Sequence, residues 1–308
     1  MAVGTDGWAP IVGDDYPDWE IDGVDWPHRD WSRFMQVGGV RWHVQTGGSG
    51  PNLVLVHGTG AATHSWRDLM PELAKDFRVW AMDLPGHGFT SPLPRSRMGL
   101  GGMASAVAGL LQHLNVRPEV VVGHSAGAAI LCRMVLDDRL RPDLLVGLNA
   151  ALTPFGGAAA RLFSPAARVM ARTPLPRLVA WRARDPASIE RLTTGTGSRI
   201  DARGLRLYQR LTQRSGHVAQ ALVMMAQWDL EGLHRELPAV DIPVLLIAGE
   251  QDQAVPPVQA VRVAAQLPRA RSVVLEGLGH LAHEEAPAGT ARRIRAERDR
   301  VVANPSLA

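Results

Sequence analysis

The sequence has little cysteine, little lysine and no long apolar run. Its 308 residues include a single cysteine, Cys132, which excludes a disulfide within the chain. No uninterrupted apolar stretch is long enough to span a bilayer, and the first residues lack the basic and apolar regions of a signal peptide. These absences predict a cytoplasmic protein.

Signatures of metal and nucleic-acid binding are also missing. The eleven histidines include no His-Glu-x-x-His pattern, and a lone cysteine forms no paired motif, so we expect neither a metal site nor another cofactor. Basic residues are almost all arginine, Lys75 being the only lysine, and aromatic residues do not interleave with them. We therefore expect a small-molecule substrate and no nucleic acid.

Charge is distributed unevenly along the chain, although the net charge is only +3. Residues 1–30 hold eight acidic residues against Arg29 alone, and they also contain three tryptophans: Trp8, Trp19 and Trp26. We expect an N-terminal extension, residues 1–32, that lies over the body with these rings as anchors. The alternative is a mobile acidic tail.

The opposite bias occurs in residues 155–215, where twelve arginines face three acidic residues. Such a basic face predicts contact with an anionic membrane or with carboxylates of a substrate. The alternative is that the arginines only reflect codon composition.

Short apolar runs alternate with helical patterns along most of the chain. Strands are predicted at residues 33–37, 40–45, 52–56, 78–82, 119–122, 144–148, 242–249 and 272–276. This alternation predicts an α/β fold with a doubly wound, mostly parallel sheet, and Gly38-Gly39 predicts a hairpin near its start. We place the core at residues 33–152 and 239–300, an inserted helical cap at 153–238 and a tail at 301–308.

The most informative motif is Gly123-His124-Ser125-Ala126-Gly127, between a predicted strand and a predicted helix. Gly-x-Ser-x-Gly in this context is a nucleophile elbow, in which small neighbours permit the strained turn that exposes the serine. Ser125 is therefore the candidate nucleophile. A glycine-rich turn without chemistry is the alternative.

An acid and a histidine each follow a later strand, in the order expected after the serine. Asp252 follows the strand at 242–249, and His280 follows the strand at 272–276. We predict that His280 accepts the proton of Ser125 and that Asp252 orients His280. Glu250 and His283 are the competing residues; we expect His283 to face solvent or to cap a helix.

Two backbone N–H groups are predicted to bind the oxyanion. One belongs to Ala126, directly after the nucleophile, and the other to Thr59, in the loop that follows the strand at 52–56.

The chain resembles the α/β-hydrolase superfamily over residues 33–298. The matching residues are His57-Gly58, 83–88, 123–127, 249–252 and Gly279-His280. This resemblance implies an α/β-hydrolase fold with an inserted helical cap. A serine at the elbow argues against haloalkane dehalogenases and epoxide hydrolases, which carry an aspartate there.

A narrower resemblance is carried by segments 25–29, 32–34, 41–45, 57–61, 64–67, 83–90 and 123–129. They are similar to magnesium-chelatase accessory proteins of bacteriochlorophyll biosynthesis in phototrophic bacteria. The resemblance implies a role in pigment synthesis at the magnesium chelation step, with a tetrapyrrole or a chelatase subunit as partner and a location at the photosynthetic membrane.

The cap is expected to select the substrate, and its large apolar residues could line a pocket for a bulky ligand. These residues are Phe155, Phe163, Met170, Trp181, Met224, Met225 and Trp228. Met224, Trp228 and His124 are the candidate substrate-binding residues, although ordinary packing is the commoner role of such side chains. Three functions stay open: a serine hydrolase of an ester or related acyl compound, a non-catalytic tetrapyrrole-binding or chelatase accessory factor, and a cofactor-free haloperoxidase or perhydrolase.

Overall fold

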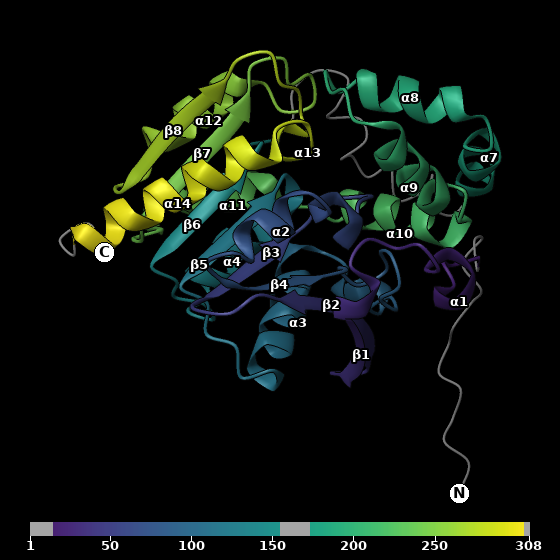
Figure 1. Cartoon of the computed structure of the whole chain (residues 1–308), viewed down its shortest axis with the longest axis horizontal. Coiled ribbons are helices and arrows are strands. Elements are labelled where there is room, and N and C mark those ends of the chain that lie inside the picture. The colour runs from purple at the N-terminus through teal and green to yellow at the C-terminus, as the bar shows by residue number, and fades with distance from the viewer. Residues whose placement is uncertain (1–14, 155–172, 305–308) are drawn as a thin grey trace, which may run out of the picture.

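The computed structural model describes residues 15–154 and 173–304, and its centre is an eight-stranded sheet in the order β1-β2-β4-β3-β5-β6-β7-β8 (Figure 1). The strands are β1 (Ser32–Val37), β2 (Val40–Gly47), β3 (Asn52–Val56), β4 (Arg78–Met82), β5 (Val120–His124), β6 (Leu144–Leu148), β7 (Val244–Gly249) and β8 (Ala270–Leu275). β2 is antiparallel to β1 and β4, whereas every other neighbouring pair is parallel. The predicted doubly wound, mostly parallel sheet is confirmed.

The hairpin between β1 and β2 is present where Gly38-Gly39 predicts it. Val37 pairs with Val40, and the two glycines have φ of 59° and 80°, in the left-handed region that a two-residue turn requires.

Alternation along the central strands produces an apolar layer on each face of the sheet. On β3, Val54 and Val56 contribute to one cluster, whereas Leu53 and Leu55 contribute to the other. The first cluster packs against α3 (Leu100–His113), α4 (Ala126–Leu136), α11 (Leu230–Glu236) and α12 (Pro257–Ala264). The second packs against α2 (Leu69–Leu73), α13 (Ala282–Glu285) and α14 (Pro287–Ala303). Fully burying each large apolar side chain contributes about 1.5–3 kcal/mol, so these layers fix the sheet that presents the site.

Helices replace the alternating pattern between β6 and β7. Four of them gather beyond one end of the sheet, beside α1 (Figure 1), and we call them the inserted helices: α7 (Leu175–Arg182), α8 (Pro186–Thr194), α9 (Ala202–Thr212) and α10 (Ser215–Ala226). None of the helices in the described ranges is both long enough and apolar enough to span a membrane.

The N-terminal extension contains the short helix α1 (Trp19–Asp22) and is anchored by two rings. Trp19 lies 4.8 Å from Phe89, measured between ring centroids, and Trp26, 2% exposed, donates from Nε1 to Thr63 Oγ1 at 3.0 Å. Trp26 also shares an apolar cluster with Leu207 of α9. Trp8 lies outside the described residues.

Opposite charges join this extension to the inserted helices. Arg214 pairs with Asp15 at 2.9 Å and with Asp22 at 2.8 Å, and Arg210 pairs with Asp25 at 2.6 Å. The acidic segment and part of the arginine-rich segment therefore neutralise each other. Prediction from sequence had assigned them to separate roles.

Candidate active site

Ser125 stands at a strained turn between β5 and α4. Its φ of 50° and ψ of −114° place a non-glycine residue in a region that L-residues rarely adopt. A Cβ on Gly123 would lie 2.4 Å from the Ala128 nitrogen, and one on Gly127 would lie 2.0 Å from the Val56 oxygen. Only glycine fits at these two positions, as the elbow motif predicts.

His280 and Asp252 are brought together from two separate loops. His280 Nδ1 lies 2.8 Å from Asp252 Oδ2, and the histidine side chain is 12% exposed while the carboxylate is fully buried. Asp252 Oδ1 accepts N–H bonds from Ala254 and Val255, each at 2.8 Å. A buried, oriented carboxylate on Nδ1 leaves Nε2 of His280 free to accept a proton.

Asn149, at the end of β6, supports this pair and was missed by sequence reasoning. Its Nδ2 donates to Asp252 Oδ2 at 2.8 Å and to the Gly279 carbonyl at 3.2 Å, while its φ is 46°. It therefore connects the acid loop to the loop of His280. The only signal in the sequence is an asparagine directly after a buried strand.

Ser125 shares this edge of the sheet with the pair. Its N–H donates to Leu148 of β6 at 2.9 Å, and His124, one residue earlier, has Nε2 3.0 Å from the His280 carbonyl. Among the described residues, no hydrogen bond joins the Ser125 hydroxyl to His280. In structures without substrate, such catalytic contacts are often long and tighten when substrate binds.

Thr59 and Ala126 flank the elbow serine. Gly58 packs so closely that a Cβ on it would lie 3.1 Å from Ser125 Cβ and 2.9 Å from His124 Nδ1, which brings the Thr59 backbone next to the elbow. The N–H groups of Thr59 and Ala126 have no acceptor within the described part of the chain. Two unpaired donors beside the predicted nucleophile have the arrangement that binds a developing oxyanion in serine hydrolases.

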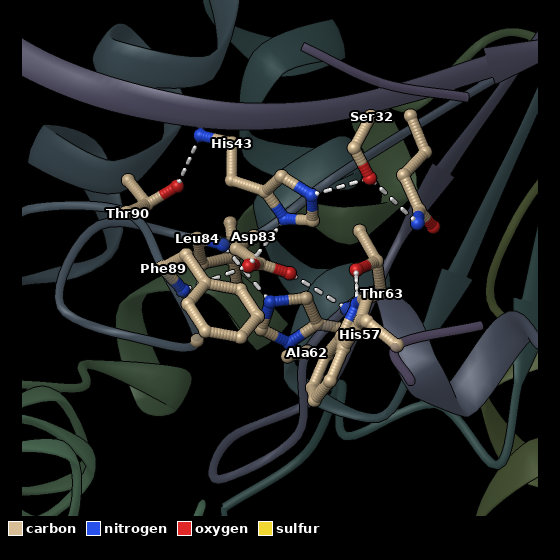
Figure 2. Close-up of polar contacts among 12 residues, drawn as sticks. Ser32, His43, His57, Ala62, Thr63, Asp83, Leu84, Phe89 and Thr90 are labelled. Atoms are coloured by element: carbon tan, nitrogen blue, oxygen red, sulfur yellow. Dashed lines mark hydrogen bonds and ion pairs between the residues drawn. The ribbon is translucent and has the colours of Figure 1, made fainter. Parts of the chain in front are cut away.

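The loop that carries Thr59 is supported by a buried network around Asp83 (Figure 2). Asp83 Oδ1 accepts the Thr63 N–H at 2.7 Å, and Oδ2 accepts the Phe89 N–H at 2.9 Å and lies 2.7 Å from His43 Nδ1. Burial alone would raise the pKa of Asp83, but His43 and these hydrogen bonds hold that pKa below its ordinary value. The carboxylate thus joins the loops after β3 and β4 to β2.

His57 belongs to the same network and is held in one neutral form. Its Nε2 accepts the Leu84 N–H at 2.9 Å, and its Nδ1 donates to the Gly58 carbonyl at 2.7 Å. Burial lowers the pKa of His57, so the ring stays uncharged behind the Thr59 loop.

The competing residues have other contacts. Glu250 accepts the Gly277 N–H at 3.0 Å through Oε2, at the end of β8. The expectation for His283 is wrong: it is 1% exposed, because Trp66 and His124 cover its ring at centroid distances of 4.7 and 4.5 Å. Within residues 15–154 and 173–304, no three side chains of metal-ligating type gather into a site.

The comparison of the sequence with known families decides its membership. The profile of the alpha/beta hydrolase fold matches residues 51–287. The chain belongs to the α/β-hydrolase fold family. The elbow, the Asp252 loop and the His280 loop follow one another in the sequence in the order that is general for α/β-hydrolases.

Relatives within the α/β-hydrolase family differ in what their names say. The chain is 42% identical to the magnesium-chelatase 30 kDa subunit of Rhodobacter capsulatus, covering 86% of this chain and 94% of that one, so the narrower resemblance is confirmed. It is 28% identical to a pimeloyl-[acyl-carrier protein] methyl ester esterase of Aeromonas hydrophila, over 77% of this chain and 91% of the esterase. An α/β-hydrolase fold protein of Burkholderia ambifaria superposes with a TM-score of 0.73 at 25% identity, over 86% and 97% of the two chains.

In this α/β-hydrolase, the predicted substrate-binding residues are mostly buried. His124 is 3% exposed and packs against the rings of His280 and His283, so it supports the histidine loop instead of lining open space. Met224 is fully buried, with its sulfur 3.9 Å from the Thr59 hydroxyl, and Trp228 lies in the larger apolar core.

The other apolar residues expected to wall the pocket lie partly inside and partly outside the described residues. Trp181 is 60% exposed on α7, and Met225 of α10 is partly buried. Three residues lie outside the described residues: Phe155, Phe163 and Met170.

Proposed function

We propose that this protein is a serine hydrolase of an ester or related acyl compound. The observation that supports this most is the 2.8 Å contact between His280 Nδ1 and buried Asp252, at the edge of the sheet where Ser125 occupies the strained elbow. A neutral turn without chemistry would require neither the strain nor the buried acid.

Each residue has a defined step. The Ser125 oxygen attacks the acyl carbon while its proton passes to Nε2 of His280, and the N–H groups of Thr59 and Ala126 bind the resulting oxyanion. The intermediate collapses, the C–O bond to the leaving alcohol breaks, and His280 returns the proton to that alcohol. Water, deprotonated by His280, then releases the acid from Ser125. Asp252 orients His280 and stabilises its charged form.

A fluorophosphonate probe tests the assignment. Wild type should label, whereas Ser125→Ala should not, and hydrolysis of a short activated ester should fall at least about 10³-fold in Ser125→Ala and His280→Ala. Ser188→Ala, on α8, is the matched control and should behave as wild type. Unlabelled wild type, or a loss below tenfold in both variants, would exclude this chemistry.

The 42% identity to a magnesium-chelatase subunit supports a second candidate, in which the fold binds a tetrapyrrole or a chelatase subunit without catalysis. The two candidates separate in a pigment-producing strain that lacks this protein. Full restoration of bacteriochlorophyll by Ser125→Ala favours the accessory role at the chelation step, and failure with a folded variant favours hydrolysis. Cofactor-free haloperoxidase or perhydrolase chemistry would use the same three residues, and halide-dependent turnover would identify it.

We also propose that the outer face of the inserted helices contacts an anionic membrane surface. Leu178, Trp181 and Leu192 are 51%, 60% and 63% exposed. Near them, Arg182 and Arg184 pair with no acidic residue that the structure describes. Exposed tryptophan and leucine beside arginine suit an anionic lipid interface.

Vesicle flotation tests this contact. Vesicles rich in anionic lipid should bind wild type at low salt and release it at high salt, because the attraction is screened. Arg182→Glu with Arg184→Glu should abolish binding, whereas Arg292→Glu with Arg293→Glu on α14 should not. Equal binding to neutral vesicles, or none at low salt, would refute it.

A further inference from the structure

The loop between α8 and α9, residues 195–201, touches both loops that carry the proposed acid and base. One carbonyl makes the connection: Thr196 O accepts the N–H of Gln253 at 3.1 Å and that of His280 at 3.4 Å. Gln253 directly follows Asp252. A single carbonyl of the α8–α9 loop thus bonds to the Asp252 loop and to the His280 loop at once.

Backbone packing in this region leaves no room for side chains. Gly197 has φ of +83°, and a Cβ on it would lie 1.8 Å from the Gln251 oxygen. A Cβ on Gly279, next to His280, would lie 2.3 Å from the carbonyl carbon of Gly197. The three loops are therefore in direct backbone contact, with no side chain between them at these positions.

Two side chains add polar contacts to this backbone packing. Fully buried Ser198 accepts the Leu281 N–H through Oγ at 2.8 Å. Glu285 accepts the Gly279 N–H through Oε1 at 3.0 Å and the Arg199 N–H through Oε2 at 3.1 Å. Of the two neighbours of His280, Leu281 is thus bonded directly to the α8–α9 loop, and Gly279 is connected to that loop through Glu285.

A buried ion pair continues the connection into α9. Tyr208 of α9 donates to Glu284 Oε1 at 2.7 Å, and Arg67 pairs with Glu284 Oε2 and, at 3.1 Å, with Asp201 at the start of α9. Glu284 lies four residues after His280. The inserted helices and the histidine loop therefore share one set of buried contacts.

We propose that the α8–α9 loop is a positioning element that holds Asp252 and His280 in register, with Gly197 and Ser198 as its positioning residues. The inference rests on the proposed hydrolase function. A displacement of the inserted helices moves the acid–base pair with them, so that catalysis depends on how these helices are seated. Misplacing a proton acceptor by about 1 Å can cost up to about 100-fold in rate.

Hydrogen exchange measured by mass spectrometry tests the positioning without relying on activity. In Gly197→Ala, exchange should accelerate about tenfold in both 249–255 and 277–283, because the two loops lose a shared support. In Ser198→Ala, which removes only the acceptor of the Leu281 N–H, it should accelerate in 277–283. Gly109→Ala, where a Cβ meets nothing within 4 Å, and Ser188→Ala are the matched controls. Unchanged exchange in either variant, or acceleration in only one of the two loops in Gly197→Ala, would overturn the proposal.

Kinetics then separate positioning from general damage. For an activated ester, Ser198→Ala should lower kcat about 10- to 100-fold with KM within about threefold, and it should shift the acidic limb of the pH–rate profile that reports His280. If Ser198→Ala changed KM by as large a factor as kcat and left the pH–rate profile where it is in wild type, the positioning role would be overturned. The two proposals can fail separately. If the variants show the expected faster exchange but the wild-type protein does not label with fluorophosphonate, the positioning role is retained and the hydrolase function is rejected.

Discussion

The inserted helices are attached to the body on two sides by different kinds of contact. On one side, α9 and α10 meet the N-terminal extension through partly exposed ion pairs such as Arg214–Asp22 and through the ring of Trp26. On the other side, the α8–α9 loop meets the Asp252 and His280 loops through buried backbone contacts.

This difference indicates which of the two attachments can be weakened by salt or by a single substitution without disrupting the backbone. Ion pairs with side chains in reach of solvent respond to salt and to single substitutions, and each contributes little. Backbone packing at Gly197 and Gly279 tolerates no added atom. We therefore expect changes on the extension side to alter stability, and changes on the catalytic side to alter turnover.

Acidification should weaken the sites of two buried histidines, His217 of α10 and His283 of the histidine loop, before it weakens the ion pairs of the extension. Burial lowers the pKa of His217 to about 4 and that of His283 to about 3, from an ordinary 6.5, so each is neutral in the folded protein and takes up a proton on unfolding. Their contribution to stability is complete above pH 6.5 and is lost as pH falls toward 4 and 3.

On the extension side, the bond from Arg210 holds the pKa of Asp25 below its ordinary 3.8, so that contact is lost only as pH falls below 3.8. Circular dichroism during urea unfolding at a series of pH values measures the trend. Stability at pH 4 that is as high as at pH 6.5 would contradict the burial of these histidines, since burial raises the pKa of Glu284 to about 7 and this offsets only one of them over that range.

Asp252→Asn should lower kcat by about 10³–10⁴-fold, because the His280 tautomer is no longer fixed. Asp22→Asn is the matched change on the extension side and should leave kcat within about threefold of wild type. Steady-state hydrolysis of an activated ester measures both. A larger loss in Glu250→Gln than in Asp252→Asn would show that the acid is misassigned.

Trp26→Ala should lower the free energy of unfolding by about 3–5 kcal/mol, because a large ring that is 2% exposed leaves a cavity between the extension and α9. Trp181→Ala, which removes a ring that is 60% exposed, should change it by less than about 0.5 kcal/mol. Urea titration followed by circular dichroism compares them. Similar losses in both variants would mean that the extension is not anchored by Trp26.

Arg214→Ala should lower the free energy of unfolding by about 1–2 kcal/mol, less than Trp26→Ala, because it leaves the Asp22 carboxylate, 8% exposed, without its cation. Raising the salt concentration should bring the free energy of unfolding of Arg214→Ala closer to that of wild type, as measured by urea titration followed by circular dichroism. The control is Arg206→Ala, on α9. A difference between the two free energies that does not change with salt would mean that Arg214 acts through packing instead of charge.

Much of the fold and of the candidate site could be predicted from sequence because it is encoded locally. The elbow at residues 123–127 is recognised from five consecutive residues, because only glycine fits at its two ends. The hairpin at Gly38-Gly39 is likewise recognised from two residues. The assignments of Asp252 and His280 depended on their order after Ser125 and on their positions after strands, since parallel strands bring their ends to one edge.

The remaining features depend on contacts between distant segments. Asn149 meets Asp252 across 103 positions in the sequence, and Arg214 meets Asp22 across 192. His283 was expected at the surface because it is followed by two glutamates, yet Glu284 is itself buried against Arg67. Local composition does not reveal which charges find partners within the fold.

The low reactivity of the Cys132 thiol has a practical consequence for labelling. It is buried in α4, and burial raises the pKa of its thiol to about 12, so a maleimide at neutral pH meets no reactive native thiolate. Arg199→Cys, at an exposed position of the α8–α9 loop whose backbone bond to Glu285 is retained, would therefore accept a single fluorophore or spin label without prior removal of the native cysteine. The label would report spectroscopically whether that loop moves when substrate is added.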